Sequence, residues 1–451
     1  MVTYKTPNVY VEEISTIPPS VAEVSTGIPA FIGYTEKAEQ DGADLTNVPT
    51  RISSILDYET LFGKAEESSF DVTTENGEIE TISNPDIKYL MYYALRFYFD
   101  NGGGACYIVS IGNYSTNPKA KADFVAGLSA LEKEDEPTLI LLTDAVNLAE
   151  TDYYDLCTQA LVQCNKLKDR FAIFDVLSET TDSITNFREG IGTEYLKYGA
   201  AYYPYLQTSL NYYYSDDFVT ITDESATPAA YSGGTLSDIQ STNTDLYNKI
   251  KTEIGKKRIV LSPSAALAGI YAKVDRDRGV WKAPANVSLA SVLGPTVKIS
   301  NEDQEELNVD PTAGKSINAI RSFTGKGTLV WGARTLAGND NEWRYIPVRR
   351  LFNLIEESIQ KSTAFVVFES NNAITWLKVK SMIDSYLEGL WRQGALGGTT
   401  SEEAFFVNIG LGKSMTQQDI LEGRMIVEIG IAAVRPAEFI ILKFSHKLQE
   451  S

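Results

Sequence analysis

Two Gly-Lys-Ser tripeptides are the residues of this sequence with the clearest chemical potential. Gly314-Lys315-Ser316 and Gly412-Lys413-Ser414 resemble the end of a phosphate-binding loop, in which backbone N–H groups and a lysine hold a nucleotide phosphate. Such a loop also needs a glycine five positions before the glycine of the tripeptide. Val309 and Val407 stand at those two places, so we expect no nucleotide binding.

Histidine, cysteine and acidic motifs also argue against an enzyme or a metal site. The chain has one histidine, His446, which excludes His-rich zinc sites and argues against a Ser-His-Asp triad. The cysteines lack CxxC spacing, which favours buried free thiols in a reducing compartment. Asp275-Arg-Asp277-Arg-Gly279 starts like a calcium loop but has glycine where a third carboxylate belongs, so we expect a turn with solvated charges. The sequence predicts no catalytic residue, no metal and no cofactor.

The charge of the chain is strongly acidic and unevenly spread. The 451 residues carry 60 Asp and Glu against 40 Lys and Arg, a net charge of −20, which disfavours nonspecific binding to nucleic acid or an anionic membrane. Residues 249–350 are nevertheless basic, with 17 Lys and Arg against 10 Asp and Glu. This asymmetry favours contact with another copy or a partner, and neutralisation within one fold explains it equally well.

Composition places the chain among folded globular proteins. Hydrophobic residues make up 43% and charged residues 22%, and the length suggests about three domains. The tyrosine clusters 202–205 and 212–214 supply either interface area or a tyrosine-rich core. No apolar run reaches the roughly 18 residues of a membrane span, and no apolar signal core follows Met1, so we expect synthesis in the cytoplasm and no membrane insertion.

The beginning of the chain has the pattern of an extended arm. Val9 and Val11 alternate with Tyr10, Glu12 and Ile14, as in a strand at the edge of a sheet. Two prolines at 18 and 19 uncouple this segment from the next domain. An edge strand of this kind needs a partner strand from elsewhere.

Strand and helix patterns then alternate along the chain. We expect strands at 29–33, 106–111, 138–142, 170–176 and 200–206, and helices at 85–100, 152–168 and 183–189. This alternation predicts an α/β layer with at least partly parallel strands. Residues 214–245, rich in Ser, Thr, Asp and Gly, are expected to form a surface insertion, and the acidic stretch 302–307 a loop.

The last third of the chain mixes strands with two helices. We expect strands at 327–331, 343–348 and 364–368, helices at 349–360 and 372–393, and terminal strands at 424–434 and 438–444. The helix 372–393 has an apolar stripe that leaves Lys378 exposed and Lys380 near its edge. Both ends of the chain are therefore candidates for sheet edges.

Several ordered blocks of the sequence match the pattern of one family. The opening Thr6-Pro-Asn-Val-Tyr-Val-Glu-Glu13 resembles a Pro-Gly-Val-Tyr-Val element, with Asn8 where glycine is usual. Val367-Phe-Glu-Ser-Asn371 carries Ser370 where proline is common. The other blocks are 97–107, 268–275 with 278–286, 318–323, 330–336, 343–350 and 435–439. Over nearly its whole length the chain resembles the sheath protein of contractile tails, found in tailed phages, R-type bacteriocins and extracellular contractile injection systems.

This resemblance implies a structural protein. Sheath subunits stack as hexameric rings around an inner tube and contract to drive the tube through a target envelope. The expected partners are other copies, the tube protein, and baseplate and terminal cap proteins. Assembly in the cytoplasm would precede incorporation into a phage tail or an extracellular or cell-anchored particle. The rival interpretations are an α/β enzyme, for which no constellation of nucleophile, base and orienting residue is visible, and a monomeric binding module, against which the family-like blocks and the two terminal strands both argue.

The resemblance also implies which residues join subunits. The fold would be a multidomain α+β or α/β architecture whose C-terminal α+β domain is completed by strands exchanged between subunits. The expected donated residues are Val9, Tyr10, Val11, Glu12, Ile14, Phe439, Ile440, Ile441 and Leu442. Lys378 and Lys380 are candidates for the tube contact, and Arg344, Arg349 and Arg350 for charge contacts between subunits. The expected domains are an arm at 1–24, an N-terminal segment at 25–112, a middle domain at 113–300 and a C-terminal domain at 301–451.

Overall fold

The computed structural model describes residues 20–115, 120–177 and 182–441, which form two compact units. The larger unit contains Ser25–Leu354 and the chain from Arg435 onward, and the smaller one joins the chain up to Val24 with Ile355–Val434. The residues expected to form one C-terminal domain, 301–451, are thus divided between the two units. No helix in the described part of the chain is long and apolar enough to cross a membrane.

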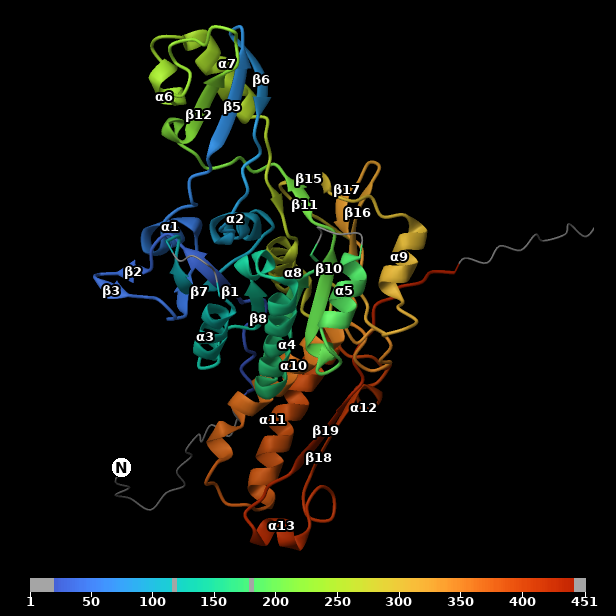
Figure 1. The fold of residues 1–451 in the computed structure, drawn as a ribbon. Coiled ribbons are helices and arrows are strands. Elements are labelled where there is room, and N and C mark those ends of the chain that lie inside the picture. The colour runs from blue at the N-terminus through green and yellow to red at the C-terminus, as the bar shows by residue number, and fades with distance from the viewer. Residues whose placement is uncertain (1–19, 116–119, 178–181, 442–451) are drawn as a thin grey trace, which may run out of the picture. The chain divides into compact units, whose positions relative to one another are not determined.

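A nine-stranded sheet forms the centre of the larger unit (Figure 1). Its strand order is β14-β17-β16-β10-β9-β8-β1-β7-β4, and the six strands from β16 to β7 run parallel. The bounds are β1 Pro29–Thr35, β4 Thr50–Ile52, β7 Cys106–Asn113, β8 Leu139–Leu142, β9 Phe171–Asp175, β10 Gly199–Tyr203, β14 Val287–Ser288, β16 Asn318–Phe323 and β17 Gly327–Val330. The predicted α/β layer with parallel strands is confirmed.

Helices cover both faces of this sheet. Helix α2 Met91–Asp100 places Met91 against Gly33 of β1, and α3 Lys121–Leu131 places Gly127 against the adjacent Ile32. Because successive strand residues point to opposite faces, α2 and α3 lie on opposite sides of β1. Helix α8 Ser264–Arg278 packs beside α2, and α4 Glu150–Leu167 packs beside α3. All three cysteines are buried free thiols, as predicted.

The remaining short elements of the larger unit surround this sheet. A second sheet has the order β13-β11-β15. The elements are β2 Glu39–Gln40, β3 Ala43–Asp44, α1 Ile55–Phe62, α5 Ser183–Gly190, β11 Leu206–Thr208, β13 Val260–Leu261, β15 Val292–Pro295 and α9 Asn301–Asn308. The loop expected at 302–307 is therefore wrong: Ser300 caps a helix there, because its hydroxyl accepts the Asp303 N–H while the Asp303 carboxylate accepts the Ser300 N–H.

The expected surface insertion 214–245 proves to be part of a separately packed small sheet. Strand β12 Val219–Asp223 pairs with β5 Phe70–Glu75, which pairs with β6 Glu78–Ile82, and helices α6 Leu236–Ile239 and α7 Thr244–Ile254 cover them. Phe70, Leu236 and Ile250 are among nine buried residues that form a core of their own. The turn between β5 and β6, Asn76-Gly77, has left-handed φ values of 52° and 81°.

Both tyrosine clusters contribute to cores. Tyr202 is buried in the main core, and its hydroxyl is 2.7 Å from that of Tyr271. Tyr212 and Tyr214 pack edge-on against Phe70 of the small sheet. Of the two interpretations that the sequence left open, the tyrosine-rich core describes these residues.

The smaller unit holds the long helix that the sequence predicted. Helix α11 Ala373–Arg392 begins at Asn372, whose side chain accepts N–H groups of the first turn, and ends before Gly394, whose φ is 83°. The remaining elements are α10 Ile346–Ser362, which starts in the larger unit, α12 Ser401–Ala404, β18 Phe405–Ile409, α13 Gln417–Leu421 and β19 Val427–Ile431.

Three strand predictions in the last third of the chain need correction. The strand expected at 343–348 is wrong because α10 already begins at Ile346. The strand expected at 364–368 is a short 3-10 helix, Ala364–Val366. The strand expected at 424–434 is the shorter β19. Apolar runs of this length do not distinguish a strand from a buried helical turn.

Asp175, buried where β9 ends, gives a prediction about pH. Its carboxylate accepts the Ser264 N–H at 2.8 Å and the Ser264 hydroxyl at 2.6 Å, yet burial raises its pKa to about 6. The folded state therefore holds this proton more tightly than the unfolded chain, whose aspartates titrate near about 3.9. The stability that this group contributes is full below about pH 4 and is lost as the pH rises through about 6.

We expect Asp175→Asn to abolish this dependence. At pH 8 the unfolding free energy of the variant should exceed that of the unchanged protein by up to about 3 kcal/mol, because each unit of pKa shift corresponds to about 1.4 kcal/mol. At pH 5 this difference in unfolding free energy should be smaller. Urea unfolding at both pH values measures this difference in unfolding free energy, and the substitution Asp277→Asn at an exposed position is the control. A gap of equal size at both values would contradict the prediction.

Candidate assembly interface

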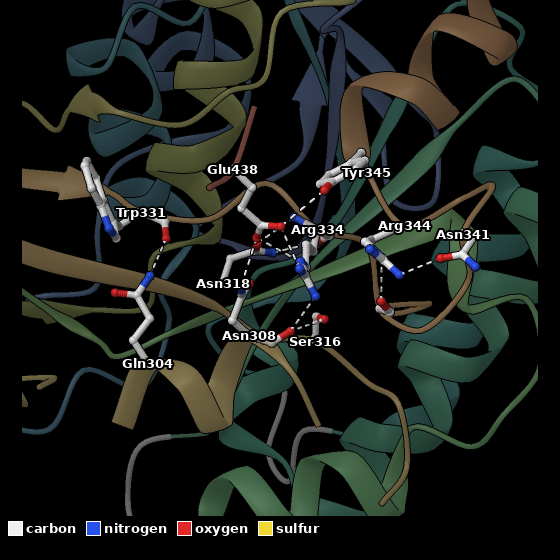
Figure 2. A network of polar contacts seen from close by, with 11 residues as sticks. Gln304, Asn308, Ser316, Asn318, Trp331, Arg334, Asn341, Arg344, Tyr345 and Glu438 are labelled. Atoms are coloured by element: carbon white, nitrogen blue, oxygen red, sulfur yellow. Dashed lines mark hydrogen bonds and ion pairs between the residues drawn. The ribbon is translucent and has the colours of Figure 1, made fainter. Parts of the chain in front are cut away.

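The C-terminal arm, residues 435–441, is held at its root by an ion pair between Glu438 and the buried Arg334. Glu438 accepts two hydrogen bonds from Arg334, from Nε at 2.9 Å and from Nη2 at 2.6 Å. Asn308 donates its amide to the same carboxylate at 2.9 Å, and the Tyr345 hydroxyl donates at 3.2 Å. Figure 2 shows Glu438 surrounded by these three side chains. We call this arrangement the arm clamp.

The main chain around Arg334 is fixed from strand β16. Asn318 donates its side-chain amide to the Arg334 carbonyl at 2.8 Å and accepts the Arg334 N–H at 2.8 Å. Arg334 also donates from Nη1 to the Asn308 carbonyl at 3.0 Å. Arg334 is therefore held by contacts that do not involve the arm, which lowers the entropic cost of its bidentate pair with Glu438.

The electrostatics of the clamp favour a charged carboxylate. Burial alone would raise the pKa of Glu438, but the hydrogen bonds from Arg334, Asn308 and Tyr345 and the guanidinium charge hold that pKa below its usual value. Arg334 is buried, and a buried guanidinium without a carboxylate partner is strongly unfavourable. The two residues thus need each other.

Beyond the clamp the arm is apolar and exposed. Phe439 is 71% exposed, Ile440 80% and Ile441 79%. None of the described residues 438–441 lies in a strand, so the predicted terminal strand has no partner strand within the described part of the chain. Leu442 lies outside the described residues.

The smaller unit offers strand edges of its own. Strands β18 and β19 form a two-stranded antiparallel sheet in which Phe405 pairs with Ile431 and Ile409 with Val427. Helix α11 packs against β18. In the described chain each of these strands has a single strand neighbour, which leaves an outer edge on both sides of the sheet.

The root of the N-terminal arm is fixed by two serines of α10. The N–H of Ala22 donates to the Ser362 hydroxyl at 3.1 Å, and the N–H of Val24 donates to the Ser358 hydroxyl at 3.2 Å. Alternate backbone N–H groups of an extended segment thus bond one helix. The predicted donated residues Val9, Tyr10, Val11, Glu12 and Ile14 lie outside the described residues.

Two of the three arginines proposed for contacts between subunits serve their own subunit instead. Arg349 lies 4.3 Å from the ring centre of Trp343 and donates to Asn353 at 2.8 Å. Arg350 donates to Asp275 at 2.9 Å and stacks on Tyr271. Both arginines are buried, so that suggestion needs correction, and Asp275 belongs to a buried pair in α8 rather than to a solvated turn.

Arg344 and the two lysines of α11 differ in how firmly they are held. Arg344 donates to the Gly338 carbonyl at 3.0 Å and to Asn341 at 2.8 Å and is half-buried (Figure 2). Lys380 donates to Asp384 at 2.8 Å and to the Val407 carbonyl at 2.9 Å. Lys378 is exposed on the same helix.

The two Gly-Lys-Ser tripeptides form no phosphate-binding loop. Lys315 is buried and donates its amine to the carbonyl of Arg188, and burial lowers its pKa. Lys413 sits in a tight turn whose N–H groups bond the Gly410 carbonyl. Among the described residues no group of His, Cys, Asp and Glu is arranged to hold a metal ion.

Part of the basic segment is neutralised inside the chain. Lys249 pairs with Glu78 at 3.0 Å, and Lys251 pairs with Asp216 at 2.8 Å. Internal neutralisation, one of the two explanations of the charge asymmetry, therefore accounts for some of these residues.

The residues of the clamp were missed at the level of sequence, although a signal existed. Arg334 and Glu438 lie within the family-like blocks 330–336 and 435–439, and Tyr345 within 343–350. Each charged residue stands among apolar neighbours, and a charge in such a setting needs a partner. Asn308 and the serines of α10 carry no comparable signal.

Comparison with known proteins identifies the family of the chain. Residues 338–447 match the family model described as the phage tail sheath C-terminal domain. The tail sheath protein of Enterobacteria phage T4 is 30% identical over 135 residues, which cover 30% of this chain and 20% of the T4 protein. That of Vibrio phage KVP40 is 29% identical over 130 residues, covering 29% of this chain and 19% of that one. The match thus spans about a fifth of these relatives.

Solved sheath structures match over the whole chain. The PVC sheath of an extracellular contractile injection system, in its contracted state, is 32% identical with a TM-score of 0.68, covering 100% of this chain and 99% of that chain. The contracted helical sheath of the anti-feeding prophage is 33% identical with a TM-score of 0.68, covering 99% and 100%. The chain belongs to the family of contractile tail sheath proteins, and it is a structural sheath subunit.

The arm clamp gives a prediction about stability. Glu438→Gln keeps the shape of the side chain but removes its charge and one acceptor, so we expect a loss of about 1–3 kcal/mol in unfolding free energy at pH 7. Because the pKa of Glu438 is held low, its contribution is present at neutral pH and fades as the pH falls below about 4.

Urea unfolding at pH 7 and in acid measures this loss. Glu302→Gln, which removes an exposed carboxylate of α9, is the matched control and should stay within about 0.5 kcal/mol of the unchanged protein. Equal effects of the two substitutions at pH 7 would mean that the clamp contributes nothing.

Proposed function

We propose that this sheath subunit assembles as stacked hexameric rings around an inner tube and contracts to drive the tube through a target envelope. The observation that carries the proposal is the C-terminal arm, which is clamped at Glu438 and continues as exposed apolar residues. In a subunit that worked alone, this apolar segment would stay exposed to water and no contact would compensate for it. The subunit is not an enzyme in this proposal.

Strand exchange joins the copies. The segment Phe439–Leu442 of one subunit and the segment Val9–Ile14 of another add to the outer edges of the β18–β19 sheet in a neighbour. Main-chain hydrogen bonds at a sheet edge are directional and depend little on sequence. At about 0.5–1.5 kcal/mol net per bond, each join is modest, but a lattice in which every subunit makes two joins is strongly held.

The anchored roots of the two arms allow the strand-exchange contacts between subunits to bear force. Pull on the C-terminal arm is resisted by the bidentate pair of Arg334 and Glu438, and pull on the N-terminal arm by Ser358 and Ser362. Connections anchored in this way would allow the domains of neighbouring subunits to rotate while the contacts between subunits persist.

The energy for contraction comes from the contacts between subunits. Neither Gly-Lys-Ser tripeptide forms a phosphate-binding loop, so nothing among the described residues supports a nucleotide-driven mechanism. A contracted state with larger or better matched interfaces supplies the driving force. The basic residues of 249–350 that are exposed, together with Arg344, are the candidates for meeting acidic residues of the 1–248 segment in another copy.

Other partners follow from the same role. Baseplate and terminal cap proteins bound the sheath at its two ends, and the net charge of −20 disfavours nucleic acid as a partner. The subunit assembles in the cytoplasm and becomes part of a phage tail or of an extracellular or cell-anchored particle. The alternative of a monomeric binding module would leave both arms without a purpose.

The inner tube is met by the exposed side of α11. Lys378 is the stronger candidate because it is exposed, whereas Lys380 already bonds Asp384 and the Val407 carbonyl. We expect Lys378→Glu to reduce co-assembly of the sheath with the tube several-fold, since an acidic partner would then be repelled. Co-sedimentation measures this, with Lys133→Glu, at an exposed lysine of the larger unit, as the matched control. Unchanged co-assembly would move the tube contact elsewhere.

Truncation tests the strand exchange. A variant that starts at Ser20 keeps the bonds of Ala22 and Val24, and a variant that ends at Glu438 keeps the clamp. We expect both to stay soluble and to keep their circular dichroism spectra and most of their melting temperatures. Both should fail to form tubes in electron micrographs, because each lacks one of the two donated segments.

Two results would count against this mechanism. An insoluble or molten truncation would mean that the removed strand belongs to the core of its own subunit. A truncation that still polymerises would remove that arm from the mechanism.

A further inference from the structure

The sequence contains two Asn-Gly dipeptides, and the structure places them in opposite surroundings. Asn76-Gly77 forms the turn between β5 and β6, and both residues are exposed. Asn101-Gly102 follows the end of α2, and Asn101 is only 2% exposed. An Asn-Gly pair has chemical potential because glycine has no side chain to keep its backbone nitrogen away from the side-chain amide of the preceding asparagine.

At the exposed pair, both reacting groups are available. Within the described ranges, neither the Gly77 N–H nor the side-chain amide of Asn76 takes part in a hydrogen bond. The turn is held through a different group, since the backbone N–H of Asn76 donates to the Ser225 hydroxyl at 2.8 Å. A Cβ atom added at Gly77 would meet no atom within 4 Å, so the surroundings leave room for movement.

At the buried pair, the same two groups are held. The Asn101 side chain donates to the Phe97 carbonyl at 2.8 Å and accepts the Ala290 N–H at 2.8 Å. The Gly102 N–H donates to the Phe99 carbonyl at 3.0 Å. A reaction between the side chain and the glycine nitrogen would have to break these hydrogen bonds inside the fold.

We propose that Asn76 is a site of spontaneous covalent modification, the loss of its side-chain amide. The Gly77 nitrogen attacks the side-chain carbonyl carbon of Asn76, a carbon–nitrogen bond forms, and the bond to the side-chain nitrogen breaks. Ammonia leaves and carries the proton that the Gly77 nitrogen has lost. Water then opens the resulting ring at either of its carbonyl groups, which gives aspartate or isoaspartate. The net reaction consumes one water, releases one ammonia and needs no oxidant or reductant.

The isoaspartate product disturbs the hairpin, because it routes the main chain through the side-chain carbon and lengthens the turn by one backbone atom. The turn has two residues, and the strands that it joins are paired directly beside it, Glu75 with Glu78. A turn of this length fixes the register of its strands, so a longer main chain disrupts that pairing. Strand β6 has β5 as its single strand neighbour in the described chain, and it therefore loosens first.

The effect stays within the small sheet. The nine buried residues under β5, β6 and β12 form a core of their own, which is separate from the core of the nine-stranded sheet. The modification therefore leaves the parallel strands and the arm clamp as they are. It depends on the turn alone and does not require that the subunit acts as proposed above.

Peptide mass spectrometry of the aged protein tests the site. The full chain is incubated at mildly alkaline pH, folded and in urea, and digested at intervals. Conversion changes the mass of a peptide by the difference between an amine and a hydroxyl group, and in water enriched in heavy oxygen the product carries one solvent oxygen. The rate at Asn76 should rise with pH, because the attacking nitrogen must lose its proton.

The buried dipeptide is the internal control. In urea both sites have the same local sequence and should convert at similar rates. In the folded protein Asn101 should convert at least about 100-fold more slowly than in urea, because small misplacements of reacting groups cost about that much, whereas Asn76 should stay within about tenfold of its rate in urea. Equal protection of the two sites in the folded protein, or no conversion at Asn76 while the chain in urea converts, would overturn the proposal.

Hydrogen exchange tests the structural effect. After ageing, the backbone amides of residues 78–82 should exchange several-fold faster, and those of Leu139–Leu142 in the nine-stranded sheet should not change. Asn76→Gln, aged in parallel, is the matched control, since its longer side chain would have to close a larger ring. Unchanged exchange at 78–82 in converted protein, or faster exchange in the aged Asn76→Gln variant, would contradict the loosening of the hairpin by this reaction.

Discussion

The buried guanidinium of Arg334 is the constraint on which the assembly features of this molecule depend. Without a carboxylate it would be an unpaired charge in an apolar setting, which costs several kcal/mol. Glu438 provides the carboxylate from the far end of the chain, 104 positions away. The C-terminal arm is consequently tied to the larger unit, although the residues before it, from Ile355 to Val434, pack in the smaller one. Phe439 and Ile440 therefore leave the subunit from a fixed point.

Helix α10 shows the same use of buried charge. Its first turns hold Arg349 among the rings of Trp343, Tyr198 and Phe352, and Arg350 against Asp275. Later in the same helix, Ser358 and Ser362 receive the root of the N-terminal arm. One continuous helix thus carries a firmly packed end in the larger unit and an arm anchor in the smaller one.

The predictability of these features from sequence has physical causes. The parallel strands were predictable because buried strands such as Leu139–Leu142 are continuous apolar runs between helical patterns. The helix at Ala373–Arg392 was predictable from its apolar stripe and the glycine that ends it. The segment Ala364–Val366 was not, because three apolar residues satisfy a strand and a helical turn equally.

The candidate assembly interface also has a part that the sequence predicts and a part that it does not. The exposed C-terminal arm could be inferred from the family resemblance, but the clamp could not. Nothing in the spacing of Arg334, Asn308 and Glu438 requires that they meet, since only the packing of β16 and α9 brings them together. Likewise, two consecutive arginines such as Arg349 and Arg350 are typical of a charged surface. Only the fold shows that Arg349 packs on the ring of Trp343 and that Arg350 pairs with Asp275.

The separately packed small sheet has a consequence for how sequences of this kind can diverge. Its nine buried residues share no cluster with the main core, and its hairpin turn at Asn76-Gly77 is a two-residue loop with both φ values positive. A peptide inserted at that turn would disturb neither the parallel sheet nor the arm clamp. In a polymer of identical subunits such a peptide would recur once per subunit, so a single change in one gene would be displayed as a regular array.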